Sequence, residues 1–268
     1  MWWSRPLQRG YRPLLPDNLL DLVARSFALV QVGGVSGTGP DRGRNFERVF
    51  YGLCSSRRIH LSEKAGARTL AETRAASGIC HEVDGATRAV DCVTHWELKY
   101  LSGEVPKNEF LIFNGKALDF LQGSKRLFAR APLHRFFLTG SNVRDDCRYY
   151  AALWGIMLIE PDRLPLPLLY EAIGRGASAA LSEADCRAVR ERVVWACRPL
   201  QAVLEELGSW FAGASNTVIC GPGALRVAKE VVDIQEQIGA SVLDYLDDEC
   251  PEWIDDAAED TWAAAGGW

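Results

Sequence analysis

Hydrophobic residues recur at helical spacing in two stretches near the start of the chain. Over residues 17–29 apolar positions follow a period near 3.6, and Pro16 precedes them at a typical helix start. A second stretch, 45–53, carries one apolar face at i, i+3, i+4 and i+7, made of Phe46, Val49, Phe50 and Leu53. The pattern predicts two helices that are joined by the Gly-rich segment 33–40.

From about residue 69 the period shortens toward two. Residues 79–84 and 92–100 have the alternating, β-branched and aromatic pattern of strands. Residues 85–88 between them read Gly-Ala-Thr-Arg, which is suitable turn chemistry. We therefore predict a β-hairpin over residues 79–100.

The following region alternates between helical and strand-like spacing. Residues 105–121 place four apolar side chains on one helical side, namely Phe110, Phe113, Ala117 and Phe120. Residues 135–140 and 155–160 are short apolar runs typical of buried strands, and a short helix is expected over 147–154 between them. This order of elements predicts an α/β core.

The last third of the chain has only helical periodicity. One helix is expected from Ser182, which resembles a capping-box residue with Asp185, to about Phe211. A second is expected from Pro222 to about Asp247, and together they would form an antiparallel hairpin that packs on the core or on a second chain.

These predictions divide the chain into four parts. We expect an N-terminal helix and flexible loop, an α/β core, a helical hairpin and an acidic tail, over residues 1–40, 41–176, 177–248 and 249–268 respectively.

Composition narrows the class of protein. Hydrophobic residues make up 48% and charged residues 24%, which is an ordinary globular composition. No run of about 18 apolar residues is present, so we expect no membrane partner, and without an apolar leader we expect a cytoplasmic location. The eight cysteines include no CxxC pair and are expected to be buried thiols.

The charges are distributed unevenly. Residues 1–148 contain 22 Lys and Arg against 15 Asp and Glu, whereas residues 149–268 contain 8 against 20. Nine carboxylates and no Lys or Arg follow from Asp244 onward. A basic first half suits a polyanion such as nucleic acid. The acidic tail favours either a docking role or a purely solubilising one.

Three other kinds of site are disfavoured by spacing. The Gly-rich segment 33–40 lacks the Lys-Ser/Thr pair of a phosphate-binding loop, and no GxSxG nucleophile motif is present. Cys80 with His81 and Cys92 with His95 could suggest zinc. On the predicted strands, however, His81 and Asp84, like Cys92 and His95, are three positions apart and point to opposite faces, and no two-residue Cys knuckle is present.

The most informative segment contains Asp84 and, thirteen positions later, Glu97-Leu98-Lys99. Glu97 and Lys99 share one face of a strand, and Asp84 can approach Glu97 across the hairpin. Two such carboxylates suit Mg²⁺ (or Mn²⁺), with Glu47 completing the acidic cluster and Glu82 as a rival ligand. Such a Glu-x-Lys can also be a simple surface ion pair.

In this order and spacing the chain resembles the PD-(D/E)xK nuclease superfamily over about residues 41–160. The resemblance implies a restriction-endonuclease-like αβββαβ core with a mixed central sheet, here followed by the C-terminal helical hairpin. It also implies Mg²⁺-dependent cleavage of DNA in defence, mobile-element or repair processes. Asp84 and Glu97 would ligate the metal, Glu47 would orient its water, and Lys99 would assist the nucleophile or the transition state.

The helix after Lys99 is expected to border the substrate cleft. Its polar and basic residues, and those just beyond it, either hold phosphates or form an ordinary solvated helix face: Lys107, Asn108, Lys116, Lys125 and Arg126. His95 shares the face of Glu97 and is expected either to line the cleft or to be a structural histidine.

Two interpretations of function follow. One is a metal-dependent endonuclease acting on DNA. The other is a catalytically inactive protein of the same fold that binds nucleic acid or assembles with a protein partner or a second copy through its C-terminal helices and tail.

Overall fold

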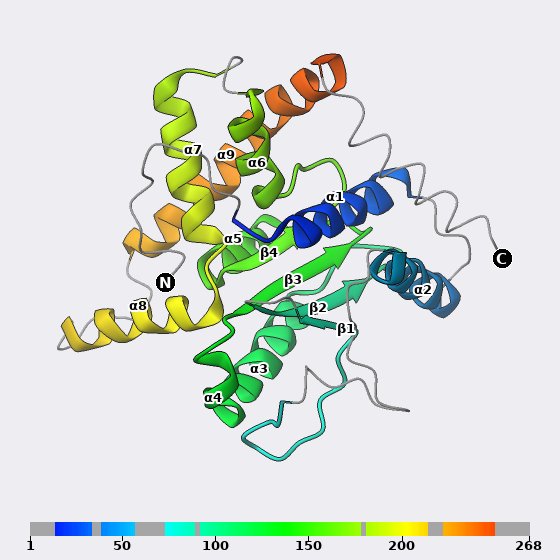
Figure 1. Cartoon of the computed structure of the whole chain (residues 1–268), viewed down its shortest axis with the longest axis vertical. Coiled ribbons are helices and arrows are strands. Elements are labelled where there is room, and N and C mark those ends of the chain that lie inside the picture. The colour runs from blue at the N-terminus through cyan, green and yellow to red at the C-terminus, as the bar shows by residue number, and fades with distance from the viewer. Residues whose placement is uncertain are drawn as a thin grey trace.

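The computed structural model describes residues 14–33, 39–56, 73–88, 92–177, 181–213 and 222–249. The elements in these ranges are α1 (Asp17–Val32), α2 (Pro40–Ser56), β1 (Gly85–Arg88), β2 (Val93–Lys99), α3 (Lys107–Gly123), α4 (Lys125–Phe128), β3 (Leu133–Thr139), α5 (Asp145–Trp154), β4 (Ile156–Ile159), α6 (Leu166–Arg175), α7 (Glu183–Ala196), α8 (Leu200–Gly213) and α9 (Pro222–Glu249) (Figure 1). The α/β class predicted from the sequence is confirmed.

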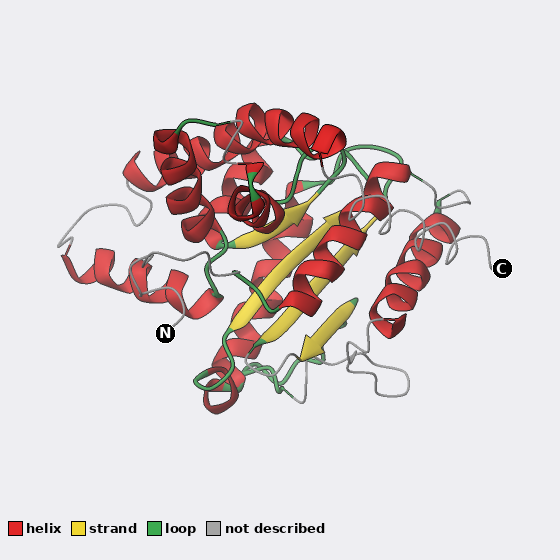
Figure 2. Ribbon diagram, turned by 45° about the horizontal axis from the view of Figure 1, so that its top comes forward, coloured by secondary structure: helices red, strands yellow, loops and turns green. Residues whose placement is uncertain are grey.

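The strands form one mixed four-stranded sheet in the order β1-β2-β3-β4. β1 is antiparallel to β2, and the pairs β2/β3 and β3/β4 are parallel. Each parallel step requires a crossover, which α3 and α5 provide. Helices cover both faces of the sheet (Figure 2).

Successive side chains of a strand point to opposite faces of the sheet, and in this sheet both sets include buried apolar residues. On one face Trp96 stacks on Phe136 with ring centroids 4.1 Å apart, beneath α1, α2 and α6. On the other, Phe137 stacks on Phe110 of α3 at 4.2 Å and packs with Cys147 of α5. The core strands therefore lie between two helical layers.

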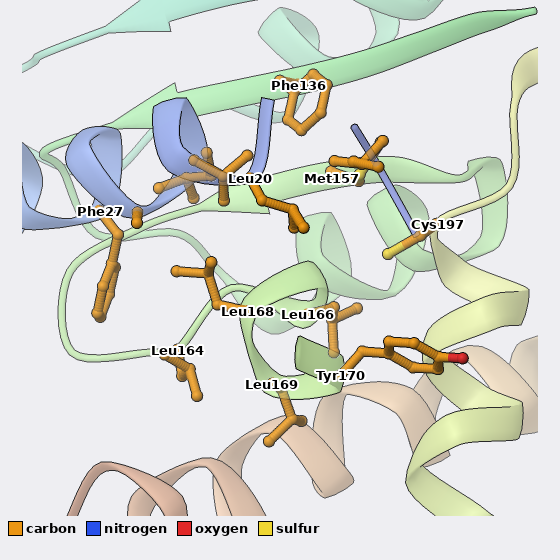
Figure 3. Close-up of a cluster of buried hydrophobic side chains, with 14 of the residues drawn as sticks. Leu20, Phe27, Phe136, Met157, Leu164, Leu166, Leu168, Leu169, Tyr170 and Cys197 are labelled. Atoms are coloured by element: carbon orange, nitrogen blue, oxygen red, sulfur yellow. The ribbon is translucent and has the colours of Figure 1, made fainter. Parts of the chain in front are cut away.

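The C-terminal helices belong to the same core as the sheet. Figure 3 shows Leu20 and Phe27 of α1, Phe136 of β3, and Leu166 and Leu168 of α6 in one buried cluster. The apolar side of α9 joins this cluster through Ala228, Val231, Val242 and Leu246. These C-terminal helices therefore pack on the core of the chain, as one of the two expectations had it.

The predicted strand 79–84 is wrong. The residues that pair with β2 are 85–88, the stretch predicted to be the turn, with Gly85 opposite Trp96 and Thr87 opposite Thr94. Residues 73–84, which we call the strap, instead run across the C-terminal end of α3. There the Ala76 amide donates to the Asp119 carbonyl at 3.1 Å. The hairpin connection falls at residues 89–91, outside the described residues.

The single helix predicted from Ser182 to Phe211 is two helices. The start is as expected, because the Ser182 hydroxyl accepts a hydrogen bond from the Asp185 amide at 3.1 Å. The break lies at residues 197–199 between α7 and α8. Pro199 has no amide hydrogen and disfavours helical backbone at the preceding residue, so the helix ends there although the apolar periodicity continues.

The structure bears on two expectations from composition, the absence of a membrane-spanning helix and the burial of the cysteines. Among the described helices, none combines the length and the apolar character that crossing a membrane would require. Five of the described cysteines are buried free thiols, and burial raises the pKa of Cys54 to about 12, but Cys80 in the strap is exposed. Of the acidic tail predicted over residues 249–268, Glu249 is the last residue of α9 and residues 250–268 lie outside the described residues.

Candidate functional site

Asp84, Glu97 and Lys99 come together where β1 begins and β2 ends. Antiparallel pairing of Gly85 with Trp96 puts Asp84 level with Glu97 on the neighbouring strand. Asp84 Oδ2 also accepts a hydrogen bond from the Leu98 amide at 2.9 Å, which fixes the carboxylate against β2. The structure thus joins three of the four residues singled out from the sequence.

Glu97 lies beneath α3 and is only 2% exposed. Its two oxygens face different lysines: Lys99 Nζ is 2.8 Å from Oε1, and Lys116 Nζ is 3.5 Å from Oε2. Lys99 Nζ also lies 3.3 Å from Glu109 Oε2. The charges therefore alternate in the order Glu109, Lys99, Glu97, Lys116, an arrangement that we call the charge row.

The charge row follows from the geometry of two elements. Glu97 and Lys99 are two positions apart on β2 and so share a face. Glu109 and Lys116 are seven positions apart on α3, close to two full turns, and so lie on one side of the helix. The buried ring of Phe113, between them in sequence, presses that side onto the sheet. Each lysine thereby meets a carboxylate of the other element.

Burial sets the protonation behaviour of the charge row. Burial is the largest cause that raises the pKa of Glu97, and the negative charge of Asp84 is the second. The positive charges of Lys99 and Lys116 oppose this rise. For Lys99 burial alone would favour the neutral amine, but the carboxylates of Glu97, Asp84 and Glu109 outweigh it and raise its pKa. Lys99 is therefore a fixed positive charge and is unsuited to accept a proton.

Glu47 reaches the site through a residue that sequence reasoning missed. The Tyr51 hydroxyl, one turn later on α2, lies 2.7 Å from the Asp84 carbonyl and 3.2 Å from Glu47 Oε2. Both groups are acceptors, so the single hydroxyl proton is shared between them. In the described part of the chain no three His, Cys, Asp or Glu side chains form a metal-binding group, so Glu47 does not join the two carboxylates as a third ligand.

The other predicted ligands are scattered. Lys107 and Asn108 are exposed at the start of α3, and Lys125 and Arg126 are exposed just past its end, about 25 Å away for a helix of this length. Lys116, predicted with them as a phosphate contact, is in the charge row instead. Glu82, the rival metal ligand, is exposed on the strap.

His95 does not line an open cleft. It is fully buried on the same face as Glu97, with its ring 4.5 Å from that of Phe113, and within the described residues neither ring nitrogen has a hydrogen-bond partner. Burial, followed by the charges of Lys116 and Arg135, holds its pKa well below the usual range. His95 is thus a neutral core residue.

Opposite His95 on β3 lies a second buried polar group. Arg135 is fully buried and donates to the Asn114 side chain and to the Trp154 carbonyl. Burial lowers the pKa of its guanidinium to about 9. Its partners tie β3 to α3 and to the end of α5, which is a structural role.

The strap that leads to Asp84 is anchored on Asp119 of α3. Asp119 Oδ1 accepts from the Ser77 amide at 2.8 Å, and Oδ2 lies 2.7 Å from His81 Nε2. Bonds from the Ser77 hydroxyl and amide, with His81, lower the pKa of Asp119 to about 2. His81 is therefore hydrogen-bonded to a carboxylate of α3, and in the described part of the chain it belongs to no group of three potential metal ligands. This anchoring positions Asp84 from a distance, and no sequence motif marks it.

The chain was compared with protein-family models, with curated proteins and with solved structures, and none of them matches it.

Proposed function

We propose that this protein is a metal-dependent nuclease of the PD-(D/E)xK kind that hydrolyses phosphodiester bonds of DNA with Mg²⁺ or Mn²⁺. One observation carries the proposal: Asp84, directly before β1, lies level with Glu97 of the antiparallel strand β2, and Lys99 is bonded to Glu97. The sheet, with one antiparallel pair followed by parallel strands, supports a restriction-endonuclease-like core.

The donor groups at the site suit a hard divalent cation. Glu97 Oε2 is a buried oxygen without a hydrogen-bond donor among the described residues, and the Asp84 carboxylate lies beside it. Two carboxylates with water completing the shell are a common way of holding Mg²⁺. When bound, the cation supplies a Lewis acid and lowers the pKa of a coordinated water.

The remaining residues have roles that follow from their charge and position. Lys99, held protonated by its carboxylate neighbours, stabilises the negative charge that grows on the scissile phosphate. Glu47 and Tyr51 orient a water on the α2 side of Asp84. Lys107 and Asn108 at one end of α3 and Lys125 and Arg126 beyond the other contact phosphates about 25 Å apart, a span of about seven base pairs.

The test is cleavage of supercoiled DNA by the purified chain in Mg²⁺ or Mn²⁺, with EDTA as the negative control. Asp84→Asn and Lys99→Met should each reduce cleavage at least about 100-fold, the usual loss when a charge-stabilising group is removed. Glu82→Gln is the matched control, because it alters an exposed carboxylate two positions from Asp84 and should keep full cleavage. Undiminished cleavage by Asp84→Asn would refute the assignment.

A second candidate function is a non-catalytic subunit of the same fold that binds nucleic acid. The observation that favours it is the closed charge row, in which both oxygens of Glu97 already face lysines. Such a protein would bind DNA equally well in Mg²⁺ and in EDTA and would not cleave it. A protein partner would meet the charged side of α9 or the acidic tail, since the apolar side of α9 is used in the core.

A further inference from the structure

We infer that Lys116 is a resident counter-ion of Glu97 that competes with the divalent cation, so that this lysine sets the metal affinity of the site. The inference rests on the proposed function, because it concerns the same carboxylate pair. It assigns Lys116 a positioning role that differs from the phosphate contact expected from the sequence.

The first support is the difference between the two lysines. Lys99 Nζ is within 2.8 Å of Glu97 and also pairs with Glu109, so two carboxylates hold it. Lys116 Nζ lies 3.5 Å from Glu97 Oε2, beyond ordinary hydrogen-bond length, and that ion pair is the one described contact of its ammonium group. Lys116 is therefore the more loosely held of the two.

The second support is the need for a cation at this position in the metal-free protein. Glu97 is 2% exposed and has Asp84 as a like-charged neighbour, whose charge raises the pKa of Glu97. Two adjacent carboxylates repel each other strongly in a poorly hydrated site. Lys116 offsets that repulsion on the Oε2 side, where Lys99 does not reach.

The third support is that Lys116 and a metal cannot share Oε2. A dication bound there and to Asp84 would lie within a few ångströms of the ammonium group, and like charges at such a separation repel. The Lys116 side chain is 18% exposed on the surface of α3, and its long aliphatic stem lets the charged end move out to water. Metal binding thus requires Lys116 to withdraw.

The experiment measures Mn²⁺ binding to the full chain by isothermal titration calorimetry or by the electron paramagnetic resonance signal of free Mn²⁺. Lys116→Met keeps the stem and removes the charge, so it should bind Mn²⁺ about tenfold more tightly than the unmodified chain. Lys116→Arg keeps the charge and should restore the original affinity. Lys229→Met, which alters an exposed lysine on α9 outside the site, is the matched control and should change the Kd less than about twofold.

A separate readout is thermal unfolding in EDTA, where Lys116→Met should melt at a lower temperature because Glu97 has lost a counter-ion. Lys116→Gln serves as the second variant if Lys116→Met does not fold. Equal or weaker Mn²⁺ binding by the charge-removing variants overturns the inference and leaves the proposed nuclease intact. Absence of Mn²⁺ binding in every variant overturns the proposed function as well. Mn²⁺ binding by Lys116→Met but not by the unmodified chain would also support the inference, because it would mean that Lys116 excludes the cation completely.

Discussion

Replacing Lys99 by Met removes the central cation of the charge row and keeps a side chain of similar length. Glu97, at 2% exposure, would then retain only Lys116, 3.5 Å away, while Asp84 remains beside it. Removing one partner of a fully buried pair costs about 3–5 kcal/mol. Because the Lys99 side chain is 25% exposed and a second cation remains, we expect a loss of about 2 kcal/mol in the free energy of unfolding at pH 8.

The loss should depend on pH in a defined direction. Lys99 lowers the pKa of Glu97, so its removal raises that pKa further above the ordinary value of 4.5. The folded state then binds a proton more readily than the unfolded state, and the free energy of unfolding falls as pH rises from about 4.5. The variant should therefore be close to the unmodified chain near pH 5 and clearly weaker at pH 8.

Urea unfolding at the two pH values, with a double variant, is the assay. Glu97→Gln combined with Lys99→Met removes the stranded buried charge, so it should recover at least half of the loss at pH 8. Lys107→Met controls for the removal of a lysine as such and should be neutral. An equal loss at both pH values, or a double variant less stable than Lys99→Met alone, would refute the account of the charge row given above.

Two further outcomes concern the strap and the sheet. Gly123→Ala should lower the free energy of unfolding, measured in urea, by about 1–3 kcal/mol, because the added Cβ would come within 2.6 Å of the Ala76 amide nitrogen. Gly115→Ala on the same helix is the control and should be neutral or stabilising, because its Cβ would have nothing within 4 Å. Similar losses in both variants would contradict the close approach at Gly123. Burial lowers the pKa of His134 to about 4, so unfolding should become easier as pH falls from 6.5 to 4, by up to about 3 kcal/mol. His134→Gln should flatten that pH dependence, and an unchanged slope would assign it to other groups.

The sequence identified the elements whose burial follows a simple period. Phe46 and Phe50 mark the buried face of α2, as expected, and β2 falls within the strand predicted over residues 92–100. The strap misled because residues 79–84 contain the β-branched residues Ile79 and Val83, although in the structure residues 76–80 are all exposed. It packs on α3, and not on a strand, through the Asp119 anchor, and such a contact between distant segments has no periodic signal.

The site was predictable in its spacing but not in its pairing. Glu97 and Lys99 share a face by strand geometry alone, and Asp84 joins them through the antiparallel step. Lys116 looked like a surface cation because a basic residue on a helix usually is one. Its seven-residue spacing from Glu109 was the available sign that both face the sheet. His95 could not be placed, since only the packing of α3 decides whether that face is open or covered.

The two carboxylates of the site belong to different positions in the sheet: Glu97 lies on β2, and Asp84 directly precedes β1. β2 lies between β1 and β3, whereas β1 is a four-residue strand at the edge of the sheet as far as the described residues form it. Opening such an edge breaks far fewer contacts than unfolding the whole chain, so we expect Asp84 to detach in a small fraction of molecules while Glu97 stays in place. Any ligand that bridges the two carboxylates binds only the closed fraction and enlarges it by mass action. Glu97 is thus the rigid part of the site, and a bound ligand would hold Asp84 in place beside it.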